Sequence, residues 1–158
     1  MILWRIATET RQYRADDVSG AGAAKSPGRW NEVGQAVLYS APTIALAVLE
    51  TAAHVDDGGL PLNRFLVRLD VPAPVWRKRR EVNPSELPAT WSAIPAGVTS
   101  AEFGSRWINS GESAILLVPS VIVPEERAAL VSPAHADAAK IKVAVVRPFD
   151  YNKLFRRS

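Results

Sequence analysis

The sequence predicts a single α+β domain. At 158 residues the chain is long enough to bury a core without disulfides and short enough to form one domain. Its 47% hydrophobic and 22% charged residues are typical of a globular protein. Helical and extended patterns follow one another without the regular βαβ spacing of a doubly wound sheet, which favours the α+β class. We therefore treat residues 1–158 as one domain.

The amino-terminal segments predict two strands separated by a long loop. Residues 2–6 form a short β-prone opening, and residues 36–40 (AVLYS) are a second candidate strand. Between them, residues 7–28 are polar and rich in glycine and alanine, so we expect a loop with about one turn of helix. Long loops inside compact domains often line binding sites.

The strongest helix of the sequence is followed by the clearest strand. Residues 42–55 (PTIALAVLETAAHV) begin with proline and are rich in helix formers, and residues 56–59 (DDGG) end the pattern. Residues 64–71 (RFLVRLDV) alternate apolar and polar side chains, which predicts a half-buried strand.

The carboxyl-terminal half predicts an irregular connection, one helix and extended segments. Residues 72–95 carry five prolines and are expected to be irregular. Residues 100–109 favour a helix with Ser100 as its N-cap. A continuous apolar run over residues 114–118 predicts a central strand; the extended segments expected after it are residues 121–123 and 140–147.

The chain has no cysteine and only two histidines, His54 and His135. Disulfides, thiolate zinc sites and cysteine nucleophiles are thereby excluded, and the composition fits a reducing cytosol. Residues 1–10 (MILWRIATET) do not resemble a signal peptide, and no apolar run reaches the ~18 residues of a transmembrane helix. We therefore expect a cytoplasmic protein without a metal site or a membrane-spanning segment.

A net charge of +3 is too small to indicate nucleic-acid binding by itself. Residues 76–80 (WRKRR), however, place a basic run beside an aromatic ring, which is suited to gripping phosphates. A solvated loop or a docking patch for an acidic partner is the commoner meaning of such a run.

Three positions break local patterns and are candidate functional residues. Arg29 follows a glycine and precedes a tryptophan, so its guanidinium is suited to holding a diphosphate, or else belongs to an edge strand. Glu50 is the one charged residue within an apolar helix pattern. Ser120 follows a proline that interrupts an apolar strand; it either presents its hydroxyl to a ligand or marks a β-bulge or strand end.

Glu50 also has a purely structural interpretation. Thr43, Glu50, His54 and Asp57 are spaced by seven, four and three residues, so they share one face of the predicted helix. Periodicity alone favours a narrow solvated stripe, with Glu50 and His54 as an i, i+4 pair. The functional alternative is that this stripe lines a cleft.

Taken together and in this order, several motifs resemble the RES-domain toxins, the toxin halves of bacterial RES–Xre toxin–antitoxin pairs. They are residues 4–6 (WRI), 28–31 (GRWN), 37–42 (VLYSAP), 45–50 (ALAVLE) and 117–126 (LVPSVIVPEE). The resemblance implies a split β-sheet related to ADP-ribosyltransferases such as diphtheria toxin, with NAD+ bound in a cleft beside it. It also implies an Xre-type antitoxin as partner, through which any contact with DNA would be made.

The resemblance implies roles for individual residues. Glu50 would stabilise the positive charge that develops on ribose when the nicotinamide–ribose bond breaks. Arg29 would neutralise the pyrophosphate, Tyr39 would stack on nicotinamide, and Ser120 would donate to a phosphate or ribose oxygen. Arg5 is a second candidate for phosphate contact.

Some alternatives stay open. Asparagines expected after the serine segment are replaced here, so Ser132 competes with Ser120 as the ligand contact. The family either degrades NAD+, with water or phosphate as acceptor, or transfers ADP-ribose to a protein; we expect degradation and keep mono-ADP-ribosylation as the alternative. From another class, an RNA-targeting toxin would use residues 76–80.

Overall fold

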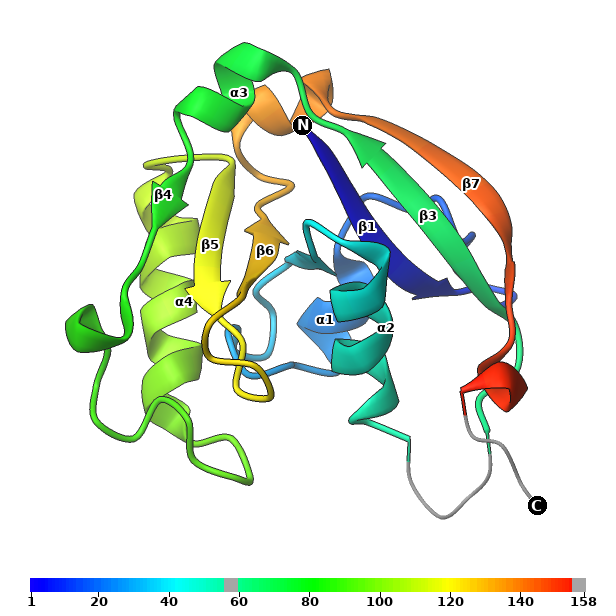
Figure 1. Ribbon diagram of the computed structural model, residues 1–158. Coiled ribbons are helices and arrows are strands. Elements are labelled where there is room, and N and C mark those ends of the chain that lie inside the picture. Colours follow the sequence, from blue (N-terminus) through cyan, green and yellow to red (C-terminus); the bar gives the residue numbers. More distant parts are fainter. Residues whose placement is uncertain (56–59, 155–158) are drawn as a thin grey trace.

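The computed structural model describes residues 1–55 and 60–154, which form two β-sheets with helices packed against them (Figure 1). The strands are β1 (Ile2–Thr8), β2 (Leu38–Ser40), β3 (Arg64–Asp70), β4 (Arg80–Glu81), β5 (Ile115–Pro119), β6 (Arg127–Val131) and β7 (Lys142–Phe149). The α-helices are α1 (Ala21–Lys25), α2 (Ile44–Ala52), α3 (Ala73–Arg77) and α4 (Val98–Ser110). Three short 3-10 helices are η1 (Pro84–Glu86), η2 (Ala136–Lys140) and η3 (Tyr151–Lys153). This mixture confirms the α+β class.

The two sheets are joined at one point. One has the strand order β1-β3-β7 and the other β2-β6-β5-β4, and all neighbours are antiparallel except β4 and β5. Trp4 of β1 and Ala41, directly after β2, exchange two backbone hydrogen bonds of 2.8 Å. The molecule therefore has the split sheet that the family resemblance implies.

Side-chain alternation along β5 explains why that strand is apolar on every residue. Ile115 and Leu117 enter a core shared with β1 and β3, whereas Leu116 and Val118 pack under α4 with Trp107. Both faces of β5 are thus buried, as the continuous apolar run predicts.

Helix α2 packs on the other face of β1. Trp4 and Ile6 meet Ile44 and Val48 of the helix, while Leu3 of the same strand points into the core between the sheets. Helix α2 therefore begins shortly after β2 and lies over the Trp4–Ala41 bridge, where the two sheets meet (Figure 1).

Most predicted elements are present, with shifted ends. The strands expected at 2–6, 36–40, 64–71, 114–118 and 140–147 and the helices expected at 42–55 and 100–109 are confirmed as β1, β2, β3, β5, β7, α2 and α4. The loop expected at 7–28 contributes two residues to β1 and contains the single helical turn α1. No helix among the described residues is long and apolar enough to cross a bilayer.

Three expectations were wrong. Residues 121–123 do not continue as a strand. They belong to a turn that is closed by a hydrogen bond of 3.0 Å from the Ser120 N–H to the Glu126 backbone carbonyl. The connection at 72–95 contains α3, β4 and η1 rather than irregular chain alone. Helix α4 begins at Val98 with Gly97 as its N-cap, so Ser100 lies inside the first turn, where its hydroxyl donates to the Gly97 carbonyl at 3.3 Å.

Candidate functional site

Arg29 lies half-buried in the segment between α1 and β2. Its Nη1 donates to two backbone carbonyls of a distant loop, those of Trp91 and Ala93, each at 2.8 Å. Burial lowers the pKa of the Arg29 guanidinium, and the nearby Glu50 carboxylate, followed by Tyr39, opposes that shift. The Glu50 carboxylate is therefore close enough to influence the pKa of the Arg29 guanidinium, although no ion pair between the two occurs among the described residues.

A buried asparagine fixes the backbone on either side of Arg29. The Asn31 Oδ1 accepts from the Gly28 N–H at 2.9 Å and from the Tyr39 hydroxyl at 2.7 Å, and its Nδ2 donates to the Ala23 carbonyl at 2.8 Å. Asn31 is 1% exposed. A Cβ at Gly28 would lie 2.6 Å from the Tyr39 hydroxyl oxygen, which explains why glycine precedes Arg29.

Tyr39 supports this segment through its hydroxyl. The oxygen accepts from the Trp30 N–H at 3.0 Å while its proton goes to Asn31. Burial raises the pKa of the Tyr39 phenol well above its ordinary value, against the opposing effects of the Trp30 N–H and Arg29. The polar edge of the ring is thus committed within the protein, and the ring packs against the core that contains Trp30 and Leu130.

Glu50 does not behave as part of a solvated stripe. Its Oε1 is buried and has no hydrogen-bond partner among the described residues. Thr43 serves instead as the N-cap of α2, accepting from the Leu46 N–H at 3.1 Å, and His54 is exposed beyond the end of the helix. Asp57, the fourth member of the predicted stripe, lies outside the described residues. A buried carboxylate oxygen without a hydrogen bond is costly, which sets Glu50 apart from the exposed Thr43 and His54 of the same predicted stripe.

Ser120 and Ser132 lie at opposite ends of the β5–β6 pair. The Ser120 Oγ accepts from the Ile122 and Val123 N–H groups at 3.1 and 3.0 Å, which closes the turn after β5. The Ser132 N–H instead donates to the Ala114 carbonyl, just before β5 begins. Both serines are buried.

Of the two ends of the β5–β6 pair, the one that carries Ser120 lies on the same side as the loop that binds Arg29. Near the end of α4, the Trp107 Nε1 donates to Ser113 Oγ just before β5 at 3.0 Å. Helix α4 therefore runs antiparallel to β5, and its beginning lies at the Ser120 end. The loop before α4 carries Trp91, whose carbonyl binds Arg29.

Arg5 lies on β1 and contacts the loop that follows this strand. It shares the face of β1 with Leu3 and Ala7, opposite the face on which Trp4 meets α2. Its Nη1 makes a long contact of 3.5 Å with the Asp17 carbonyl, its Nε has no partner among the described residues, and burial lowers the pKa of its guanidinium.

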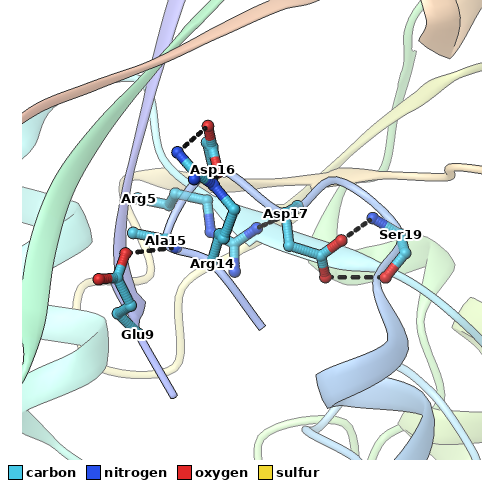
Figure 2. A network of polar contacts seen from close by, with 7 residues as sticks. All are labelled: Arg5, Glu9, Arg14, Ala15, Asp16, Asp17 and Ser19. Carbon is cyan, nitrogen blue, oxygen red and sulfur yellow. Dashed lines mark hydrogen bonds and ion pairs between the residues drawn. The ribbon is translucent and has the colours of Figure 1, made fainter. Parts of the chain in front are cut away.

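The loop that follows β1 contains a network of polar contacts near Arg5. Figure 2 shows Arg5 pointing towards Asp17, whose carboxylate accepts from the Ser19 N–H and hydroxyl at 3.2 and 2.8 Å. Arg5 thus contacts the loop that follows β1.

The basic run at residues 76–80 is largely paired with carboxylates. Lys78 contacts Asp137 at 3.5 Å, Arg79 contacts Glu81 at 3.8 Å, and Arg80 contacts Glu112 at 2.8 Å. Arg79 also stacks over the Trp76 ring, 4.3 Å from its centroid. These partners neutralise much of the charge that an RNA-binding surface needs.

Other features lie away from these residues. One surface hollow lies between α2 and the end of β7, and another surrounds Gly34, Ile108 and His135; neither is lined by Arg29, Tyr39, Glu50 or Ser120. Among residues 1–55 and 60–154, no group of three His, Cys, Asp or Glu side chains is placed to hold a metal ion.

The sequence did not indicate how Arg29 is held. Asn31 stood within the quoted motif without a role, and the carbonyls of Trp91 and Ala93 carry no side-chain signal at all. The burial of Asn31 and its contacts became visible only in the structure.

Comparison with known proteins agrees with this architecture. The model of the RES domain family matches residues 2–152. The "Prs ADP-ribosylating toxin" of a Sphingobium species is 54% identical over 149 residues, which cover 94% of this chain and 92% of the relative. "Toxin Res" of Yersinia enterocolitica is 35% identical, with 85% and 86% covered, and "Toxin Res" of Photorhabdus laumondii is 32% identical, with 96% and 93% covered. The chain therefore belongs to the RES domain family of toxins.

Proposed function

We propose that this toxin binds NAD+ between Arg29 and Glu50, breaks the nicotinamide–ribose bond and transfers the ADP-ribose to a protein. Cleavage of that bond is the reaction that the family resemblance implies. The name of the Sphingobium relative, which is 54% identical, favours a protein as acceptor over the water or phosphate that the sequence led us to expect.

One observation carries the proposal: the Glu50 Oε1 is buried, has no hydrogen-bond partner among the described residues, and belongs to a carboxylate near enough to Arg29 to oppose the lowering of its guanidinium pKa by burial. A buried carboxylate oxygen without a hydrogen bond is destabilising by ~1–3 kcal/mol or more, and such costs persist at sites where a ligand relieves them. A ribose hydroxyl, followed by the positive charge that develops on the ribose, would satisfy this oxygen.

The chemical step requires no activated nucleophile. The C1′–N bond breaks, its electron pair leaves with neutral nicotinamide, and the ribose acquires oxocarbenium character that the Glu50 carboxylate stabilises. The acceptor then attacks C1′ and loses a proton to solvent or to a nearby base.

The other residues would hold the substrate. The Nη1 of Arg29 is committed to the Trp91 and Ala93 carbonyls, which leaves its Nε and Nη2 for the pyrophosphate. Tyr39 would offer its ring to nicotinamide. Ser120 would donate its hydroxyl proton to a phosphate or ribose oxygen, since its Oγ only accepts in the two turn contacts with backbone N–H groups.

The test is incubation of the pure protein with NAD+ labelled in its adenylate half, with and without a bacterial protein extract. We expect nicotinamide release, and covalent label on a protein when the extract is present; the protein Prs of the relative's name is the first acceptor to try. Release without any labelled protein would favour NAD+ degradation. No release in either arm would contradict the proposal.

We also propose an Xre-type antitoxin as the inhibitory partner, because the family resemblance implies one. In a purified complex, NAD+ turnover should be suppressed and should return when the antitoxin is removed. Full turnover in the intact complex would contradict inhibition by occlusion of the site.

A further inference from the structure

The loop from Trp91 to Val98 is attached directly to the candidate site. Its carbonyls at Trp91 and Ala93 are the two acceptors of the Arg29 Nη1. The Trp91 ring is buried and stacks on Trp30, the residue that follows Arg29, with ring centroids 6.3 Å apart. The start of the loop is therefore fixed relative to Arg29 by a backbone contact and by an aromatic contact.

The base of the same loop is closed. The hydroxyls of Thr90 and Thr99 are hydrogen-bonded at 3.0 Å, and the Ala93 N–H donates to the Thr90 carbonyl at 3.1 Å. Loops held at both ends present their tips in a defined position, which is what recognition of a partner needs.

The tip of the loop is apolar and fully in solvent. Ile94 is 83% exposed and Val98 is 72% exposed, and every residue from 92 to 98 is exposed. Residues 87–101 carry no charged side chain, whereas Glu86 before them and Glu102 after them are exposed carboxylates. Glu102 lies one helical turn after Val98, so both face the same side of α4. Ordered apolar side chains rimmed by charge mark an interaction surface.

We propose that this loop, residues 92–98 with Glu102, docks the protein that accepts ADP-ribose. The inference rests on the proposed function and names the chemistry of its acceptor: a protein surface with an apolar patch for Ile94 and Val98 and a basic rim facing Glu86 and Glu102. The acceptor occupies this surface because the group that attacks C1′ must reach the substrate held by Arg29, and this loop borders that arginine. The attacking group forms the new bond to C1′ as nicotinamide leaves, and it releases one proton.

The experiment compares two double variants with the unaltered protein. Ile94→Ser/Val98→Ser alters the loop, and Val145→Ser/Val146→Ser alters exposed valines on β7, at the far side of the molecule (Figure 1). For each protein we would measure the Kd for NAD+, nicotinamide release to water at high enzyme concentration, and label transfer to the extract protein that the unaltered toxin labels most strongly. Glu102→Lys, with Glu102→Gln, tests the charged rim in the same assays.

The loop variant should lose about 10-fold or more in label transfer, as expected for truncation of exposed anchors, while its Kd and release to water stay within about 2-fold. The β7 variant should match the unaltered protein in all three assays. Glu102→Lys should lower label transfer more than Glu102→Gln.

Unchanged label transfer by the loop variant would overturn the proposal. If NAD+ affinity, nicotinamide release and label transfer all fell by the same factor, the proposal would also be overturned, because the loop would then act only by positioning Arg29. If the loop variant kept full label transfer but was no longer inhibited by an added antitoxin, the loop would be a binding surface for the antitoxin instead. If the unaltered protein releases no nicotinamide, the proposed function itself fails, which is a separate result.

Discussion

At the scale of single residues, the geometry around Arg29 depends on the side-chain amide of Asn31. Asn31 uses its oxygen to hold the Gly28 N–H and the Tyr39 hydroxyl, and its nitrogen to hold the carbonyls of Ala23 and Gln35. Both the oxygen and the nitrogen of the Asn31 amide are hydrogen-bonded, and the residue is only 1% exposed. Any other residue at this position would leave buried polar groups unpaired.

Asn31→Ala should therefore weaken both folding and substrate binding. We expect a loss of ~2–4 kcal/mol in the free energy of unfolding, measured by urea denaturation, because several buried polar groups lose their partner. At a temperature where the variant stays folded, the KM for NAD+ should rise, since Arg29 loses its fixed position. Asn109→Ala, at an exposed position of α4, is the matched control and should change neither quantity. Equal effects of the two substitutions would contradict the positioning role.

Tyr39 gives a prediction for alkaline pH. Because burial raises the pKa of the folded phenol, the unfolded chain loses this proton first, at its ordinary pKa of ~10. The stabilisation by the neutral phenol is complete below about pH 10 and is lost as the pH rises towards the folded pKa. The free energy of unfolding should thus fall more steeply above pH ~10 for the unaltered protein than for Tyr39→Phe, measured by denaturation at a series of pH values. Parallel curves would show that this phenol is not protected.

The motif predicted candidate residues, and the structure shows which of them lie near one another. Arg29, Tyr39 and Glu50 lie where their charges or hydrogen bonds influence one another. Arg5, taken from the same resemblance, lies on the other face of β1, because one residue along a strand reverses the direction of the side chain. Sequence spacing could not show this reversal without knowing which face of β1 meets α2.

At the scale of elements, α4 is fitted to the segment that carries Arg29. A Cβ at Gly104 would overlap the Trp30 carbonyl oxygen, and the Ser105 hydroxyl accepts from the Glu32 N–H at 3.2 Å. A glycine inside a helix is destabilising by ~1 kcal/mol relative to alanine, so its presence here reflects this close approach of two backbones.

Gly104→Ala should accordingly destabilise the protein by ~2–4 kcal/mol, despite the better helix propensity of alanine, because α4 must move away from Trp30. Gly22→Ala in α1 is the matched control: a Cβ at Gly22 would have no other atom within 4 Å, and we expect a change of no more than about 0.5–1 kcal/mol in the stabilising direction. Thermal or urea denaturation of both variants measures the difference. A neutral Gly104→Ala would show that the packing is looser than described.

Elements with a clear pattern of apolar residues were predictable from the sequence, and those with a weak pattern were not. Alternation found β3, and continuous apolarity found β5, because burial imposes these patterns. Strand β6 was missed because Arg127, Ala128 and Ala129 lack β-propensity; the strand forms because β5 and β2 pair with it on both sides. Pairing between distant strands overrode the local preference.

At the scale of the whole molecule, the candidate site depends on the split between the sheets, which brings distant segments together. The Trp4–Ala41 bridge sets α2 across the joint, so that Glu50 comes close to Arg29, while the segment before α4 supplies the carbonyls that hold Arg29 from Trp91 and Ala93. The family resemblance implied a split sheet. Which of the motif residues meet across it follows only from these long-range contacts.

The central claim is that the Glu50 carboxylate acts on the ribose, and Glu50→Gln tests it most directly, since this change keeps size and hydrogen bonding but removes the charge. We expect the rate of nicotinamide release to fall at least ~100-fold, which corresponds to ~3 kcal/mol of transition-state stabilisation, while the Kd for NAD+ and the melting temperature change little. The affinity is spared because the charge on ribose develops only in the transition state. A Glu50→Gln protein that releases nicotinamide at nearly the original rate would show that the carboxylate does not act on the ribose and would contradict the account.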